Sequence, residues 1–335
     1  MPIGARRSPH DLEDFRAALL TWYGKHRRDL PWRHTRDPYR IWLSEIMLQQ
    51  TRVAAVIEHY NRFLKRFPTV KKLAAAREAS VLAQWSGLGY YRRARNLHAA
   101  AKVVVREHAG KFPRPSSRRA WFPQTAAELR TLPGIGRYTA AAIASIAFGE
   151  PVAVVDGNVE RVISRLRGAG ASGERTWAIA EELLSRERPG DFNQAMMELG
   201  ATVCVPGEPN CAGCPVRKFC RTQGWHRAVG KKARQVKREI AYALDYRMDR
   251  VLLNQRSVKE SLMPGMWELP QVTQTASEEE LFLLRHSITV TNYAVRVVRS
   301  QGGLNGTRVR VARLKSLPLT GLTRKILRRA GITQE

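Results

Sequence analysis

The chain has 335 residues, of which 44% are hydrophobic, and a formal net charge of +28 at pH 7. This length is sufficient for about two domains with separate cores. The first residues contain no apolar stretch typical of a leader, and no run of about eighteen apolar residues occurs, so we expect an intracellular protein. Positive charge recurs at residues 92–95, 114–119, 217–221, 231–238 and 324–329, so we expect a polyanionic partner, nucleic acid ahead of a membrane surface.

The sequence from Leu12 to about Gly224 predicts helices joined by short turns. Apolar residues recur at intervals of three and four positions between residues 12 and 22 and between residues 53 and 64. Thr125 and Glu128 have the spacing of a capping box, at the start of a helix expected to end at Leu132. We therefore predict an all-α domain over residues 1–224.

The composition changes after residue 224. Residues 225–238 are polar and basic, and we interpret them as a linker. Strands are then predicted at 239–247, 250–256, 288–298 and 307–314, with a turn at Met248–Asp249. Helices are predicted at 277–285, opened by Ser277 with Glu280, and at 323–329. This order predicts a small α+β domain over residues 239–335, and a mainly α chain overall.

Glu45 lies in WLSEIMLQQT (residues 42–51), where its helical neighbours are apolar on nearly every side. An ionised carboxylate would be poorly solvated there. Either a basic residue pairs with it, or its pKa is raised so that it carries a proton at neutral pH. A structural ion pair is the ordinary alternative to a catalytic acid.

Asp156 and Asn158 lie in VVDGNV, just ahead of a helix predicted to start near Val159. The helix N-terminus favours a negative charge, so Asp156 should remain ionised. A protonated carboxyl group together with a stable carboxylate is the pair that glycoside-type chemistry uses, one to protonate the leaving group and the other to stabilise the sugar cation. The simpler alternative is that Asp156 only caps the helix.

The four cysteines of the chain all lie within seventeen residues, in a C-x6-C-x2-C-x5-C pattern. They are Cys204, Cys211, Cys214 and Cys220. Four thiolates in so short a loop can hold one tetrahedral zinc ion or an iron–sulfur cluster, and the spacing leaves both possibilities open.

LPGIGRYTA (residues 132–140) predicts a tight turn between two helices. We expect positive φ at Gly134 and Gly136, which leaves the amides that start the second helix free to hold a phosphate. Such a helix-hairpin-helix binds the DNA backbone without reading base sequence.

Six segments occur in this order: WLSEIMLQQT, GLGYYRRARNLH, LPGIGRYTA, VVDGNV, FNQAMMELGATVC and the cysteine pattern. Over residues 10–224 they resemble the helix-hairpin-helix DNA glycosylases and, among these, the MutY-type adenine DNA glycosylases. The resemblance implies a base excision repair enzyme that removes adenine mispaired with 8-oxoguanine or guanine in double-stranded DNA.

The resemblance also implies residue roles. Glu45 would protonate adenine and later assist water, Asp156 would stabilise the sugar cation, and Tyr138 and Asn158 would position these groups. The four cysteines would hold a four-iron four-sulfur cluster. The implied contacts with the extruded base and the duplex are at Arg33, Gln194, Gln50, Leu88 and Tyr90.

Tyr138 occupies the position at which the related endonuclease III enzymes have a lysine that attacks the sugar. A phenol cannot form an imine, so we expect base removal without efficient strand cleavage.

The C-terminal domain resembles, less closely, the Nudix-like domain with which this family recognises 8-oxoguanine. GMWELP (265–270) matches its strand-and-turn pattern, while the acidic helix needed for pyrophosphate hydrolysis does not follow. The resemblance implies contact between the oxidised base and His286 or Ser287; ordinary strand residues are the alternative.

Two other functions are consistent with the same sequence. One is a glycosylase of the same fold that acts on thymine or oxidised pyrimidines, and the other is a non-catalytic iron–sulfur protein that binds DNA or transfers electrons. We expect a cytoplasmic, nucleoid-associated monomer that makes no contact with membranes.

Overall fold

The computed structural model describes residues 9–108, 123–168, 172–223, 236–260, 262–273, 279–288, 291–300 and 302–334. The chain forms two compact units. The first comprises Met1–Leu64, Thr69–Ala74 and Ala99–Val229, and the second Lys65–Pro68, Ala75–His98 and Gly230–Glu335. The second unit therefore includes a helical segment that precedes the cysteines in sequence. The predicted basic run 114–119, residues 225–235 of the predicted linker, and Ser277 lie outside the described residues.

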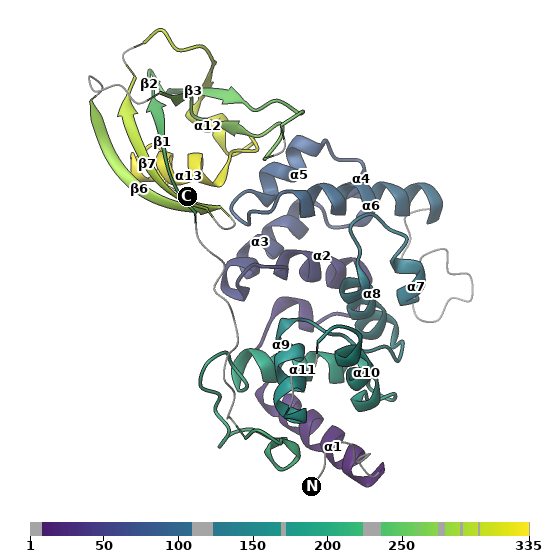
Figure 1. Ribbon diagram of the computed structural model, residues 1–335. Coiled ribbons are helices and arrows are strands. Elements are labelled where there is room, and N and C mark those ends of the chain that lie inside the picture. Colours follow the sequence, from purple (N-terminus) through teal and green to yellow (C-terminus); the bar gives the residue numbers. More distant parts are fainter. Residues whose placement is uncertain are drawn as a thin grey trace. The chain divides into compact units, whose positions relative to one another are not determined.

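The part of the chain before the cysteines is helical, as predicted (Figure 1). Its helices are α1 (Pro9–His26), α2 (Pro38–Leu48), α3 (Val53–Arg66), α4 (Val70–Ala74), α5 (Glu78–Trp85), α6 (Arg92–His108), α7 (Ala126–Leu129), α8 (Arg137–Ile143), α9 (Gly157–Arg167), α10 (Glu174–Leu183) and α11 (Pro189–Thr202). Short 3-10 turns occupy Pro31–Arg33 and Arg217–Phe219, and a π-helical turn, Ala144–Phe148, follows α8. No helix in the described ranges is both long and apolar enough to cross a membrane.

Local signals in the sequence account for several helix ends. The capping box at Thr125 and Glu128 is present in full, with each side chain bonded to the other residue's backbone. Asp37 caps α2 by accepting hydrogen bonds from the amides of Tyr39 and Arg40, and Pro38 occupies the first helical position. The chain leaves α2 near Gln50, whose φ is 56°.

Helix α2 is a core helix, since nine of its eleven residues are buried. This burial follows from its apolar composition on nearly all faces. A second core lies among α1, α9 and α11, where Phe15, Leu19, Ile163 and Ala195 are fully buried. The catalytic candidates on α2 and at the start of α9 are thus carried by rigid elements.

In the residues that the structure describes, the C-terminal part of the second unit contains two sheets and two helices. Its elements are β1 (Val236–Leu244), β2 (Tyr246–Arg247), β3 (Arg250–Gln255), β4 (Trp267–Glu268), β5 (Gln271–Val272), β6 (Glu280–Ile288), β7 (Thr291–Arg299), β8 (Thr307–Arg310), α12 (Val311–Leu314) and α13 (Gly321–Arg329). One sheet has the order β5-β1-β7-β6, with β1 and β7 parallel; the other has the order β2-β3-β4, with β8 paired to β3. Helix α13 packs beside the first sheet (Figure 1), and its Ile326 and Leu327 join the core formed with Val295 and Leu253.

The predicted turn at Met248–Asp249 is confirmed, with φ values of 47° and 57° in a tight antiparallel connection between β2 and β3. The C-terminal helix is also confirmed. The α+β character of this region agrees with the prediction.

Several predictions of secondary structure were wrong. Residues 236–238 of the predicted linker form the start of β1, and the strand predicted at 288–298 begins at Thr291, because Ile288 belongs to β6. In the described part of the helix predicted at 277–285, the chain from Glu280 onward is instead β6, which pairs with β7 from Glu280 to Ile288. The apolar run at 281–284 is compatible with either structure, and antiparallel pairing with the next strand, β7, decides between them. The strand predicted at 307–314 ends at Arg310, after which the chain turns into α12.

The glycine turn at 132–136 differs from the prediction in one respect. Gly134 has a positive φ of 76°, whereas Gly136 has φ −87° and ψ 179°, an extended conformation that is open to other residues. Gly136 precedes α8 as its N-cap residue.

Candidate active site

A cavity of about 570 Å³ in the first unit brings together most of the polar residues singled out in the sequence. This volume is in the range of small-molecule pockets. The predicted site residues in its lining are Arg33, Glu45, Gln50, Tyr138, Asp156, Asn158 and Gln194. Segments far apart in sequence therefore meet at one site.

Glu45 is buried, with 6% of its surface exposed. The hydroxyl of Tyr138 donates a hydrogen bond to its Oε2 at 2.7 Å. Burial, and to a smaller extent the charge of Asp156, raise the pKa of Glu45 to about 7 against the opposing effects of Tyr138 and Arg33. A large share of molecules thus carries a proton on Glu45 at neutral pH.

Asp156 caps α9 and is held by three donors. Its Oδ1 accepts from the amides of Asn158 and Val159 at 2.9 and 2.8 Å, and its Oδ2 accepts from the side-chain amide of Asn158 at 2.9 Å. These bonds fix the position and orientation of the carboxyl group of Asp156. The cavity therefore contains one buried carboxyl group with a raised pKa, Glu45, and a second carboxyl group held rigidly at the start of α9.

Arg161 fixes Asn158 in this arrangement, a role that no motif in the sequence indicates. Its guanidinium donates to Oδ1 of Asn158 at 2.9 Å, to the carbonyl of Gly200 at 2.5 Å and to the carbonyl of Cys204 at 2.8 Å. Arg161 thereby ties the start of α9 to the end of α11 and to the first cysteine.

Glu198 is a second buried acid of the cavity that the sequence reasoning missed, although it stands between apolar neighbours in FNQAMMELGATVC as Glu45 does in its own segment. Its carboxylate accepts two side-chain hydrogen bonds from Arg28 and one from Arg33. Burial pushes the pKa of Glu198 up, but the bonds from both arginines outweigh burial and bring it to about 2. Glu198 is thus a permanent anion that anchors Arg33 in the cavity wall.

Other predicted residues lie outside the lining of this cavity. Leu88 and Tyr90 belong to the second unit, where Leu88 is buried and Tyr90 is 45% exposed. His286 and Ser287 lie on β6 in the same unit and line a separate cavity of about 540 Å³. Gly134 lies in the turn between α7 and α8.

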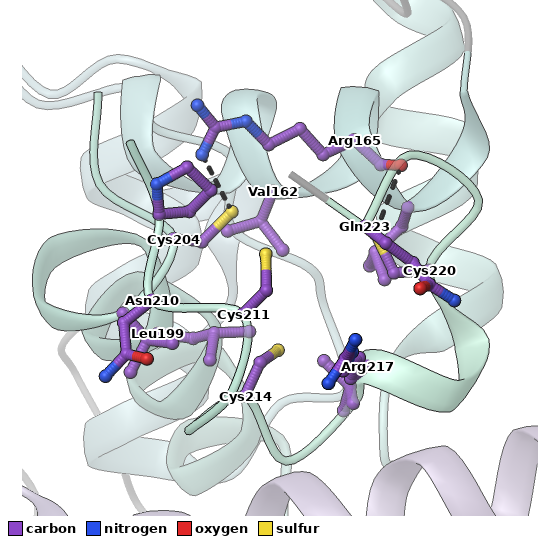
Figure 2. Close-up of a pocket in the computed structure, with 14 residues that line it drawn as sticks. Val162, Arg165, Leu199, Cys204, Asn210, Cys211, Cys214, Arg217, Cys220 and Gln223 are labelled. Carbon is purple, nitrogen blue, oxygen red and sulfur yellow. Dashed lines mark hydrogen bonds between the residues drawn. The ribbon is translucent and has the colours of Figure 1, made fainter. Parts of the chain in front are cut away.

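The four cysteines line a single pocket beside α9, together with apolar side chains of α9 and α11. Figure 2 shows their side chains around one space, with Arg165 along its edge. Across the described ranges, no three His, Cys, Asp or Glu side chains are near enough to one another to hold a single metal ion. Whether these residues suit a metal group is therefore judged from the chemistry of the pocket that the four cysteines line.

The polar groups of this pocket fit an anionic sulfur-bound centre. Arg165 is 5% exposed and donates from Nη1 to Sγ of Cys204 at 3.3 Å (Figure 2). Its Nε is buried without a hydrogen-bond partner among the described residues. Four thiolates and their metal would place negative charge beside this donor.

We predict that Glu45→Gln stabilises the protein at high pH. The folded-state pKa of Glu45, about 7, exceeds the ordinary value of 4.5, so the folded state binds more protons between these values and loses stability as pH rises through them. Glutamine removes this loss. The free energy of unfolding of the variant minus that of the unmodified protein should be roughly 2–3 kcal/mol greater at pH 8 than at pH 5.

Denaturant titration of both proteins at the two pH values measures the difference. Glu58→Gln is the matched control, because the Glu58 side chain is 82% exposed. Equal effects of the Glu45 substitution at pH 5 and pH 8 would contradict a raised pKa in the folded protein.

We also predict that Gly200→Ala destabilises the first unit. An added Cβ would lie 2.7 Å from Cβ of Asn158 and 2.9 Å from its carbonyl oxygen, so α11 and the start of α9 must separate. Such overpacking costs about 1–3 kcal/mol. Thermal unfolding measures the loss, with Gly24→Ala as control because a Cβ there meets nothing within 4 Å. Equal melting temperatures for the two variants would rule out the close approach.

Comparison of the chain with known proteins indicates its family. Residues 43–186 match the model of the HhH-GPD superfamily base excision DNA repair proteins. The adenine DNA glycosylase of Homo sapiens is 47% identical over 231 residues, which are 65% of this chain and 41% of the human protein. That of Mus musculus is 48% identical over 225 residues, 63% of this chain and 42% of the mouse protein. The matched region thus spans about two fifths of these relatives.

A solved structure has the same helical fold. A thermostable thymine-DNA glycosylase superposes with a TM-score of 0.57 and 31% identity, over 64% of this chain and 97% of that one. Together with the matched family model and the relatives at up to 48% identity, this likeness shows that the chain belongs to the HhH-GPD superfamily of base excision DNA repair proteins.

Proposed function

We propose that this protein is an adenine DNA glycosylase that hydrolyses the N-glycosidic bond of adenine mispaired with 8-oxoguanine or guanine in double-stranded DNA. The observation that carries the proposal is the pair of carboxyl groups in one cavity, Glu45 buried with its pKa near 7 and Asp156 held by three donors. The relatives of human and mouse, named as adenine DNA glycosylases, support adenine as the base. We propose a cytoplasmic, nucleoid-associated monomer that contacts no membrane.

Glu45 acts as the general acid. Protonation of a ring nitrogen of adenine makes the base a better leaving group, and the electron pair of the C1′–N9 bond departs with it. A pKa near 7 gives an acid that holds its proton at working pH yet releases it readily. The deprotonated carboxylate then accepts a proton from the water that attacks C1′.

Asp156 stabilises the positive charge that develops on the sugar. Its three hydrogen bonds hold the carboxylate in place before the charge appears, so little reorganisation is needed during the reaction. Asn158 and Arg161 are positioning residues in this step because they act through Asp156. Tyr138 orients Glu45 through the hydrogen bond to Oε2.

The described lining of the cavity contains arginines but no lysine. A Schiff base with the sugar needs a primary amine of accessible pKa, and neither an arginine nor Tyr138 provides one. We therefore propose base removal without strand cleavage, so the product is an abasic site in an intact strand.

We propose a four-iron four-sulfur cluster as the cofactor, held by Cys204, Cys211, Cys214 and Cys220. The shared pocket and the unpaired Nε of Arg165 support it. When bound, the cluster would cross-link the four cysteines of the loop from 204 to 220 and supply a site capable of one-electron chemistry.

We propose that the second unit recognises 8-oxoguanine in the strand opposite adenine. The cavity on β6, β7 and β1 is lined by Arg285, His286, Ser287, Lys237 and Arg238, which offer donors to a base and cations to its phosphate. Burial lowers the pKa of His286, and the nearby charge of Lys325 lowers it further, so the neutral imidazole is favoured. The Gly134 turn and the basic surface would hold the DNA backbone.

Thymine opposite guanine is a second candidate substrate, favoured by the likeness to the thymine-DNA glycosylase structure. It uses the same fold, so the geometry of the cavity alone does not distinguish the two bases. The substrate test therefore includes both.

A panel of duplexes tests the proposal. We expect base excision with adenine opposite 8-oxoguanine and adenine opposite guanine, and none with thymine opposite guanine or with thymine glycol. Strand breaks should appear only after alkali, because the product is an intact abasic strand. Glu45→Gln should bind the adenine duplexes normally and lose at least about 100-fold in the rate of cleavage, as expected for a general acid.

Glu58→Gln serves again as the control and should cleave as the unmodified protein does. Excision of thymine alone would replace the proposal with its alternative. Duplex binding without excision of any base would indicate a non-catalytic DNA-binding protein.

A separate measurement tests the cofactor. The purified protein should be brown, with visible iron–sulfide absorption and about four irons per chain. Cys214→Ser should lose this absorption, whereas Arg217→Gln, which lines the same pocket without a sulfur ligand, should keep it. Zinc in place of iron, with no visible absorption, would overturn the cluster.

A further inference from the structure

The loop between α5 and α6, residues 86–91, adopts a conformation that it cannot hold alone. Three of its residues have left-handed backbones, Gly87 at φ 106°, Gly89 at φ 69° and Tyr90 at φ 48°. Such a conformation is costly for a tyrosine, and it persists only where the surroundings determine it. The loop contains Leu88 and Tyr90, the residues assigned to the DNA duplex.

One set of contacts to this loop comes from the neighbouring helices. Arg93 donates to the carbonyls of Leu88 and Gly89 at 3.1 and 3.2 Å, and its guanidinium stacks on the rings of Trp85 and Tyr90. The indole of Trp85 also donates to the carbonyl of Gly89. These contacts fix the middle of the loop.

The two ends of the loop are held by a different part of the second unit. The hydroxyl of Ser86 donates to the carbonyl oxygen of Leu319 at 2.8 Å, and the hydroxyl of Tyr91 donates to the same oxygen at 3.2 Å. All three residues are at most 5% exposed. A carbonyl oxygen has two lone pairs, so one acceptor serves both donors.

Leu319 is itself held in place. The residues on either side of it, Pro318 and Thr320, exchange backbone hydrogen bonds with Trp267 of β4 at 2.9 Å each. Thr320 then caps α13 by accepting from the amide of Thr323. The acceptor therefore sits at the N-terminus of α13, in a segment of fixed geometry.

Helix α13 reaches the cavity assigned to the oxidised base. Its Lys325 donates from Nζ to the carbonyl of Arg285 at 2.6 Å, directly before His286 on β6. Helix α13 thus begins shortly after Leu319, the acceptor for the loop. Through Lys325 it also contacts β6, the strand that contains His286 and Ser287.

We propose that Ser86 and Tyr91 are positioning residues, through which the C-terminal domain sets the conformation of the 86–91 loop and couples it to recognition of the base opposite adenine. The part concerning DNA rests on the proposed function. The part concerning the loop does not, because it describes the free protein.

The first test uses the free protein. In Tyr91→Phe and in Ser86→Ala, hydrogen exchange at the amides of Ser86, Leu88 and Arg93, each bonded within the loop region, should accelerate about fivefold, and the double variant should exceed either one. Tyr246→Phe is the control, since that tyrosine lies on β2 of the same unit and is 47% exposed. Unchanged exchange in both single variants would overturn the proposal, whatever the enzyme does to DNA.

The second test measures duplex binding in the Glu45→Gln background, where the DNA stays intact. Tyr91→Phe should weaken binding of the duplex with adenine opposite 8-oxoguanine about fivefold. It should weaken binding of the duplex with adenine opposite guanine by a smaller factor. In the otherwise unmodified enzyme, the rate of cleavage at saturating enzyme should stay within about twofold. If Tyr91 had only a structural role, the substitution would weaken the binding of both duplexes by the same factor. This result would overturn the coupling.

Discussion

The catalytic cavity depends on a carboxyl group that is kept out of water. Burial is the largest influence on Glu45 and brings its pKa to about 7. The burial arises from α2 itself, in which nine of eleven residues are covered by neighbouring helices. The apolar residues that make α2 a core helix therefore also set the proton affinity of the acid, so fold stability and acidity cannot be adjusted independently at this position.

Three carboxyl groups share this cavity in three different environments. Glu45 has one phenol as its hydrogen-bond donor, Asp156 has three amide donors, and Glu198 has two arginines. Glu45 and Glu198 are both buried, and the difference between one phenol and two arginines as donors separates their pKa values of about 7 and about 2. Glu198, fully buried yet with its pKa near 2, shows how far two cations can outweigh desolvation.

The sequence predicts what depends on short-range order. The capping box, the hairpin at 248–249 and the isolated acid of α2 could all be predicted, because each depends on residues within a few positions. Strand β6 was missed because its apolar run fits either periodicity until it pairs with β7. The roles of Arg161 and Gly200 depend on the close approach of α9 and α11, about which no local pattern is informative. Glu198 carried the same signal as Glu45 and was detectable by the same reasoning.

Residues 75–98 group with the C-terminal domain and are hydrogen-bonded to it at the carbonyls of Leu319 and Pro264. Leu319 contributes a main-chain oxygen, so any residue at that position could supply it, and the specificity of the contact lies in the two hydroxyls of Ser86 and Tyr91. Loss of the acceptor would remove one hydrogen bond from each of two buried hydroxyls, which also lie 3.4 Å from each other. The loop with three left-handed residues is therefore held by buried contacts to Leu319 and not by its own conformational preference alone.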